Sequence, residues 1–144
     1  MKKLHYQITI NAPPEKVWKI LWDDASYRRW TSLFSEGSHA VSDWKKGSRI
    51  LFVGENGDGM VSMIAENKTN EFMSFKHLGM INDGIEDYDS DKAREWAGIH
   101  ENYYLKERNG STELTMETET SDEYDAYFRE TWPAAMKKIK ELSE

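Results

Sequence analysis

Two residues, His77 and Glu101, have side chains that could perform acid–base chemistry inside this protein. Proteins tune the pKa values of carboxyl and imidazole groups by burial and by neighbouring charges, so such a pair can act as acid and base. A buried carboxylate without a partner is costly, so Glu101 is expected to be paired, hydrogen-bonded, hydrated or protonated. The alternatives are a solvated, inert Glu101 near the open end of a barrel and a purely structural His77. Both alternatives stay open at the level of the sequence.

The direction of the Glu101 side chain follows from the Asn109-Gly110 dipeptide, which favours a type I′ hairpin turn. A two-residue loop fixes the register of the two strands that it joins. Four cross-strand pairs are then expected: Arg108–Ser111, Lys106–Glu113, Leu105–Leu114 and Tyr103–Met116. The apolar pairs share one face, which is the core face, whereas the charged pair falls on the solvent face. Continuing the alternation by two residues places Glu101 on the core face, opposite Thr118.

The direction of His77 follows from the alternation in residues 72–79. Lys76 prefers solvent, which sends Phe75 and His77 to the inner face of the sheet. That face and the last helix are expected to gather a set of ligand-binding residues around the two polar groups: Phe52, Phe75, His77, Glu101, Tyr103, Met116, Phe128, Trp132 and Met136. Aromatic and Met side chains with one or two polar groups are typical of a small-molecule site. The same side chains would equally suit a filled core.

Apolar periodicity defines the elements that must hold these residues in place. Alternating patterns predict strands at residues 3–10, 38–44, 49–53, 60–67, 72–79, 99–108 and 111–120. Helical patterns predict helices at residues 14–22 and 25–30, and a long C-terminal helix that follows Thr120. The element order is therefore β-α-α-β-β-β-β-β-β-α, an α+β fold in one domain that spans residues 1–144.

The last helix and the segment before the hairpin carry further signals. Thr120 and Glu123 have the spacing of a capping box, in which two side chains satisfy the first backbone donors of a helix. Pro133 is expected to kink the helix near Arg129 or to mark the first turn of its second half. Residues 81–98 have no predicted element and could form a lid, with Trp96 either plugging the entrance or packing locally.

Composition and charge exclude several classes of function. The 144 residues include 26 acidic and 19 basic ones, for a net charge of −7, whereas binding to nucleic acid or an anionic membrane surface requires a basic face. No apolar run approaches the length of a membrane span, so we expect no membrane insertion and a cytoplasmic location. The chain has no cysteine, and its four histidines lack metal-ligand spacing, so we expect neither a metal nor a cofactor.

Several motifs, in order along nearly the whole chain, resemble the START-like (SRPBCC) superfamily. The sequence Asn-Ala-Pro-Pro-Glu-Lys-Val-Trp at residues 11–18, followed by Tyr-Arg-Arg-Trp at 27–30, is similar to the N-terminal part of superfamily members, where a strand ends and a helix begins. Four later stretches are similar to its strands and its final helix: residues 44–49, 59–61 with 70–75, 110–115 and 132–139. Within the superfamily, the chain is most similar to the heat-shock-protein-90 ATPase activator homologues.

The resemblance implies a helix-grip fold, in which a curved antiparallel sheet wraps around a long C-terminal helix. It also implies a cavity between sheet and helix for an apolar or amphipathic small molecule, and binding such a molecule is the function that we favour. Two other functions remain open: docking on a chaperone, as in the activator branch, and an enzyme of the cyclase or aromatase type that uses Glu101 and His77. The expected oligomeric state is a monomer or a dimer.

Overall fold

The alternating segments of the chain form one antiparallel sheet of eight strands in the computed structural model, which describes residues 1–144. The strands are β1 (Lys2–Ile10), β2 (His39–Val41), β3 (Arg49–Val53), β4 (Gly59–Lys68), β5 (Phe72–Asn82), β6 (Ile85–Asp87), β7 (His100–Arg108) and β8 (Ser111–Thr120). The helices are α1 (Pro14–Trp22), α2 (Asp24–Thr31), α3 (Asp91–Trp96) and α4 (Asp122–Ser143). The strand order is β1-β8-β7-β5-β4-β3-β2, and β6 pairs with β5 beside this path.

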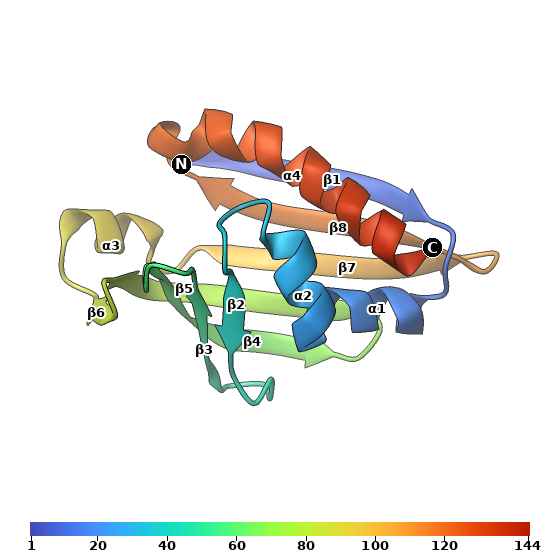
Figure 1. Ribbon diagram of the computed structural model, residues 1–144, viewed down its shortest axis with the longest axis horizontal. Coiled ribbons are helices and arrows are strands. Elements are labelled where there is room, and N and C mark those ends of the chain that lie inside the picture. Colours follow the sequence, from blue (N-terminus) through green and yellow to red (C-terminus); the bar gives the residue numbers. More distant parts are fainter.

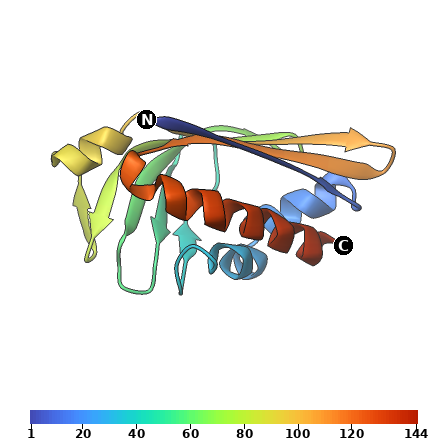
Figure 2. The same ribbon diagram turned by 90° about the horizontal axis from the view of Figure 1, so that it is seen from above.

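The sheet bends around helix α4, which lies across its concave face (Figures 1 and 2). Two irregularities in β4, at Val61/Ser62 and Ile64/Glu66, interrupt its regular pairing with β5. Irregularities of this kind bend a strand and increase its twist, which curves the sheet. Helices α1 and α2 lie on the same side of the sheet as α4 (Figure 2). This is the helix-grip arrangement that the resemblance implied, so the predicted fold class is confirmed.

Helix α4 packs on the sheet through one apolar stripe of its surface. Trp132, Ala135, Met136 and Ile139 are all buried and follow the three- and four-residue spacing of one helix face. The stripe belongs to a hydrophobic core of 20 buried residues. Although α4 is long, it is too polar to serve as a membrane span, and none of the shorter helices qualifies as one.

The register of the β7–β8 hairpin is the one predicted from its two-residue turn. Three of the predicted pairs are Arg108–Ser111, Leu105–Leu114 and Tyr103–Met116. Tyr103 and Leu114 are 1% and 0% exposed, so this face is the core face, as predicted. Lys106 also lies opposite Glu113, but the Glu113 carboxylate forms its ion pair with Arg108 instead.

Residues 81–98 contain two elements that the sequence patterns did not predict, β6 and α3. Strand β6 pairs with the end of β5, and the Ser90 side chain caps α3 by accepting from the Ala93 N–H at 3.1 Å. Strand β6 has three residues and helix α3 has six, so neither is long enough to establish a period. The predicted element order is therefore wrong in this segment.

Helix α4 begins without the predicted capping box. Ser121, not Thr120, is its N-cap residue, and the Ser121 side chain makes no capping bond. Thr120 is fully buried and pairs with Lys2 at the end of the sheet, so it belongs to strand β8 rather than to the helix. The helix also continues through Pro133, which therefore does not begin a second helix.

We predict that Ile139→Ala destabilises the protein by about 2–5 kcal/mol, because Ile139 is fully buried and its loss leaves a cavity under α4. Lys137→Ala, a change on the exposed side of the same helix, should stay within about 0.5 kcal/mol of the parent. Urea unfolding followed by circular dichroism measures both free energies of unfolding. Equal losses in the two variants would contradict the packing of α4.

Candidate functional site

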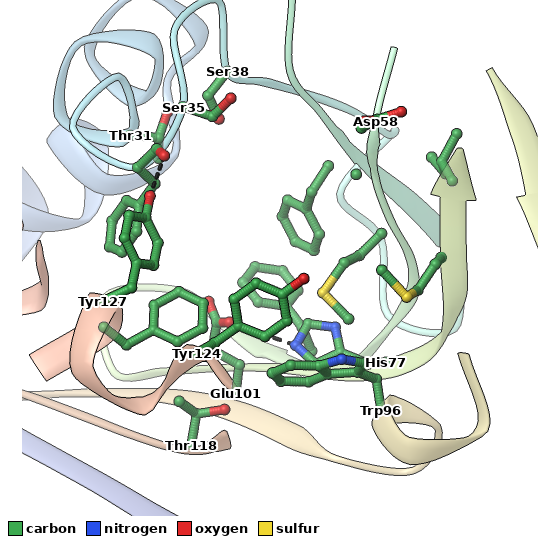
Figure 3. A pocket seen from close by; sticks show the side chains of 18 of the residues that line it. Thr31, Ser35, Ser38, Asp58, His77, Trp96, Glu101, Thr118, Tyr124 and Tyr127 are labelled. Atoms are coloured by element: carbon green, nitrogen blue, oxygen red, sulfur yellow. Dashed lines mark hydrogen bonds and ion pairs between the residues drawn. The ribbon is translucent and has the colours of Figure 1, made fainter. Parts of the chain in front are cut away.

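A pocket opens between the concave face of the sheet and helices α2 and α4 (Figure 3). Its volume is about 490 Å³, and 15 of its 27 lining residues are hydrophobic. Small-molecule sites typically have volumes of about 300–1,000 Å³. Most of the residues predicted for the site line this pocket: Phe52, Phe75, His77, Glu101, Tyr103, Phe128 and Trp132.

Aromatic rings form much of the pocket wall and hold one another in place. The Trp22 ring meets Tyr103 edge-on at 4.9 Å between centroids, and it meets Phe75 at 5.3 Å. Beside α4, Phe34 packs edge-on against Trp132 at 4.7 Å. Edge-to-face pairs are favourable beyond the area that they bury, so the rings stabilise the shape of the wall.

The polar end of the pocket is a chain of four side chains from three strands. Ser62 Oγ on β4 lies 2.6 Å from Nδ1 of His77 on β5, and His77 Nε2 lies 3.5 Å from Oε1 of Glu101 on β7. The Tyr103 hydroxyl, also on β7, donates to Glu101 Oε2 at 2.5 Å. Figure 3 shows the contact between His77 and Glu101 at the inner end of the pocket. Both side chains point inward, as the strand patterns predicted.

The contacts of the two ring nitrogens of His77 favour one tautomer. A carboxylate only accepts, so the Nε2 atom that faces Glu101 must carry a proton. In the neutral form of the ring, Nδ1 then accepts a hydrogen bond from the Ser62 hydroxyl. Ser62 is fully buried and does not line the pocket, so it orients His77 and does not meet a ligand as a nucleophile.

Glu101 is the member of this chain that a ligand can reach most readily. Its side chain is 21% exposed, whereas that of His77 is 5% exposed. Nowhere in the protein do three or more His, Asp or Glu side chains gather in a way that could hold a metal ion. The chemistry that the site offers is therefore hydrogen bonding, charge pairing and proton exchange at Glu101.

Two phenols near Glu101 stay protonated. Burial raises the pKa of Tyr103 well above its ordinary value, and the negative charge of Glu101 raises it further. Burial and, to a smaller extent, Glu101 also raise the pKa of Tyr27. Both hydroxyls therefore remain hydrogen-bond donors at neutral pH. The sequence patterns did not indicate Tyr27, because helix α2 brings it to the site from a distant part of the chain.

The segment around helix α3 forms one side of the pocket (Figure 3). Trp96 is buried, lines the pocket and places its ring 6.0 Å from that of Tyr124 on α4. Lys92 Nζ lies 5.0 Å from the centre of the Tyr124 ring and 3.6 Å from the Glu123 carboxylate. Trp96 thus packs locally and also contributes to the pocket wall. The sequence patterns did not indicate Tyr124 as a pocket residue, since helical spacing alone does not show which side of the helix borders open space.

Two residues predicted to line the pocket, Met116 and Met136, lie in the core instead. Met136 lies one turn beyond Trp132 on α4, where the helix packs against β1 and α1. Met116 pairs with Tyr6 on β1 and with Tyr103 on β7. Periodicity placed both methionines on the correct face, but the distance between helix and sheet decides whether a side chain borders open space.

A bent antiparallel sheet that holds a C-terminal helix above an aromatic pocket defines the helix-grip class of proteins. The model of the family described as "Activator of Hsp90 ATPase homolog 1-like protein" matches residues 11–144. The chain belongs to this family. The predicted place in the START-like superfamily, in the branch of the ATPase activator homologues, is therefore confirmed. Among curated proteins, nothing matches this chain.

Solved structures of similar proteins share the fold at low sequence identity. Protein MLL2253 from Mesorhizobium loti has a TM-score of 0.76 and 15% identity, and the match covers 98% of this chain and 96% of that one. The Aha1 dimer from Colwellia psychrerythraea has a TM-score of 0.74 and 20% identity, with coverage of 100% and 97%. Protein ChR145 from Cytophaga hutchinsonii has a TM-score of 0.72 and 18% identity, with coverage of 99% and 93%. Such likeness shows the fold alone, and function must be argued from the site.

We predict that Ser62→Ala destabilises the protein by about 1–3 kcal/mol, because it leaves the buried Nδ1 of His77 without a partner. Ser74→Ala is the matched control, since Ser74 bonds to Nδ1 of His100, which is exposed and can bond to water instead. Ser74→Ala should lower the free energy of unfolding by less, about 0.5 kcal/mol.

Denaturant unfolding measures the stability of both serine variants, and the ¹⁵N chemical shifts of the imidazole report the tautomer of His77. An unchanged tautomer together with unchanged stability in the Ser62 variant would show that the assigned hydrogen bond does not hold the ring.

Proposed function

We propose that this protein binds an apolar or amphipathic small molecule in the pocket between the sheet and helix α4. The observation that carries the proposal is a pocket of about 490 Å³ with an aromatic wall and a few fixed polar groups at its inner end. Small-molecule sites combine an apolar wall, which supplies affinity, with a small number of polar groups, which orient the ligand. A cytoplasmic location is part of this proposal.

The distribution of polar residues supports a ligand that lies lengthwise in the pocket. Glu101 and Thr118 lie at one end of it, whereas Ser35, Ser38 and Asp58 lie on the far side (Figure 3). Aromatic rings from the helices and from the sheet fill the wall between these two groups. An amphipathic molecule would therefore place its apolar body between the rings and a polar group at the inner end.

An enzyme of the cyclase or aromatase type is the alternative use of the same pocket, with Glu101 and His77 as acid and base. Both carboxylate oxygens of Glu101 face donors, His77 Nε2 on one side and the Tyr103 hydroxyl on the other. These contacts hold the carboxylate in place while leaving acceptor capacity for a donor on a ligand. This arrangement favours recognition of a ligand over removal of a proton from it.

We predict that Phe128→Gln weakens the binding of Nile red, a neutral apolar dye, by about tenfold, because it replaces an apolar part of the wall by an amide. Tyr104→Gln is the matched control, because Tyr104 is a partly exposed aromatic residue that does not line the pocket. Fluorescence titration of the dye measures all three affinities, and near-UV circular dichroism checks the folding of each variant. Equal losses in the two variants, or no uptake of dye by the parent protein, would refute binding in this pocket.

Docking on a chaperone is a second candidate function, and membership of the Hsp90 ATPase activator family favours it. This candidate predicts that the protein binds an Hsp90-type chaperone and raises its ATPase rate in a saturable manner. A coupled ATPase assay and isothermal titration calorimetry with the same two purified proteins measure both effects. The candidate fails if calorimetry shows no binding and the ATPase rate stays at its basal value.

A further inference from the structure

No lysine or arginine side chain pairs with the carboxylate of Glu101. Its only ion-pair contact is with His77, and Tyr103 supplies the other bond through a hydroxyl that stays protonated. Among the residues that line the pocket, Lys92 is the only lysine or arginine, and it pairs with Glu123 at the rim. The pocket therefore holds a largely buried carboxylate whose contacts come from an imidazole and a phenol, with no lysine or arginine beside it.

The carboxylate keeps acceptor sites that the protein does not use. Each oxygen of a carboxylate has two acceptor sites, and the two contacts described above occupy one site on each oxygen of Glu101. The side chain is 21% exposed and lies at the inner end of the pocket, beside Thr118 (Figure 3). A donor on a bound molecule can therefore reach Glu101 from the pocket side.

The walls near Glu101 favour positive charge as well. Tyr27 and Tyr103 lie close enough to Glu101 for its charge to raise the pKa of both phenols. Aromatic faces attract cations through their quadrupoles, most strongly where water is excluded. An anionic ligand would meet repulsion from Glu101 and no compensating cation at this end of the pocket.

We propose that the small molecule bound in the pocket carries a protonated amine, which pairs with Glu101 while its apolar body lies among the aromatic rings. This inference rests on the proposed function, since it names the class of ligand for the same pocket. The ammonium group would neutralise the buried carboxylate, which no lysine or arginine of the protein does.

Three probes with one shared apolar body separate the charge preference from binding itself. They are 1-naphthylmethylamine, 1-naphthalenemethanol and 1-naphthoate, which are cationic, neutral and anionic at pH 7. Isothermal titration calorimetry in about 0.15 M salt screens the long-range effect of the net charge of the protein. We expect the amine to bind at least about tenfold more tightly than the alcohol, and the carboxylate to bind more weakly than both.

Glu101→Gln tests whether this preference comes from the buried carboxylate, because glutamine keeps the shape of the side chain and removes its charge. We expect the variant to bind the amine and the alcohol within about twofold of each other. Glu107→Gln is the matched control, since Glu107 is an exposed glutamate at the far end of the same strand. It should keep the full preference of the parent protein for the amine.

The outcomes separate the binding of a small molecule from the preference for an ammonium group. If none of the three probes binds the parent protein, the proposed function fails. If the alcohol binds but the amine binds no better, or if the carboxylate binds best, the function survives and the ammonium inference is overturned. The inference also fails if Glu101→Gln keeps the preference or Glu107→Gln loses it. Even if the Glu101 variant does not fold, the order of affinities of the three probes for the parent protein shows whether the pocket prefers an ammonium group.

Discussion

The packing of helix α4 against the bent sheet is the constraint on which the rest of the structure depends. Its buried stripe, from Trp132 to Ile139, anchors the helix on the sheet. In that half, methionine side chains such as Met136 fill the space between the two layers. In the other half, aromatic residues such as Phe128 line the pocket instead. Because close packing is needed only where the helix is anchored, one helix supplies both the core and the wall of an open site.

Glu101 is a largely buried carboxylate, and the surrounding residues contact both of its oxygens. Tyr103 donates a hydrogen bond to one oxygen of Glu101, His77 forms an ion-pair contact with the other, and Ser62 hydrogen-bonds to the far side of the His77 ring. A buried polar network is stable only when each member is satisfied, so these side chains act together. The irregularity in β4 lies at Val61/Ser62, next to the residue that orients the histidine, so the bend of the sheet and the polar network meet at one point.

The likeness of this chain to the solved structures is a likeness of fold. Three solved structures that match nearly all of this chain superimpose well on it, although only 15–20% of the residues are identical. A helix-grip fold supplies a sheet, a helix and a space between them, and a few side chains decide what that space accepts. In this chain the space holds a carboxylate paired with a buried histidine, and its wall is rich in aromatic residues.

The sequence by itself determined the local geometry of the site. The two-residue turn at Asn109-Gly110 and strict alternation placed Tyr103 and Glu101 on the inner face, and the same alternation placed His77 there. These features depend on neighbours in the chain, because strand period and turn geometry are local properties.

Only the tertiary structure decided which inward side chains meet and which of them border open space. Tyr27 and Ser62 join the site through the packing of α2 and the bend of β4, and neither carries a local signal. Met116 and Met136 face inward as predicted but lie where helix and sheet are in contact. The physical reason is that periodicity fixes the direction of a side chain, whereas the separation of packed layers depends on the volumes of all the side chains between them.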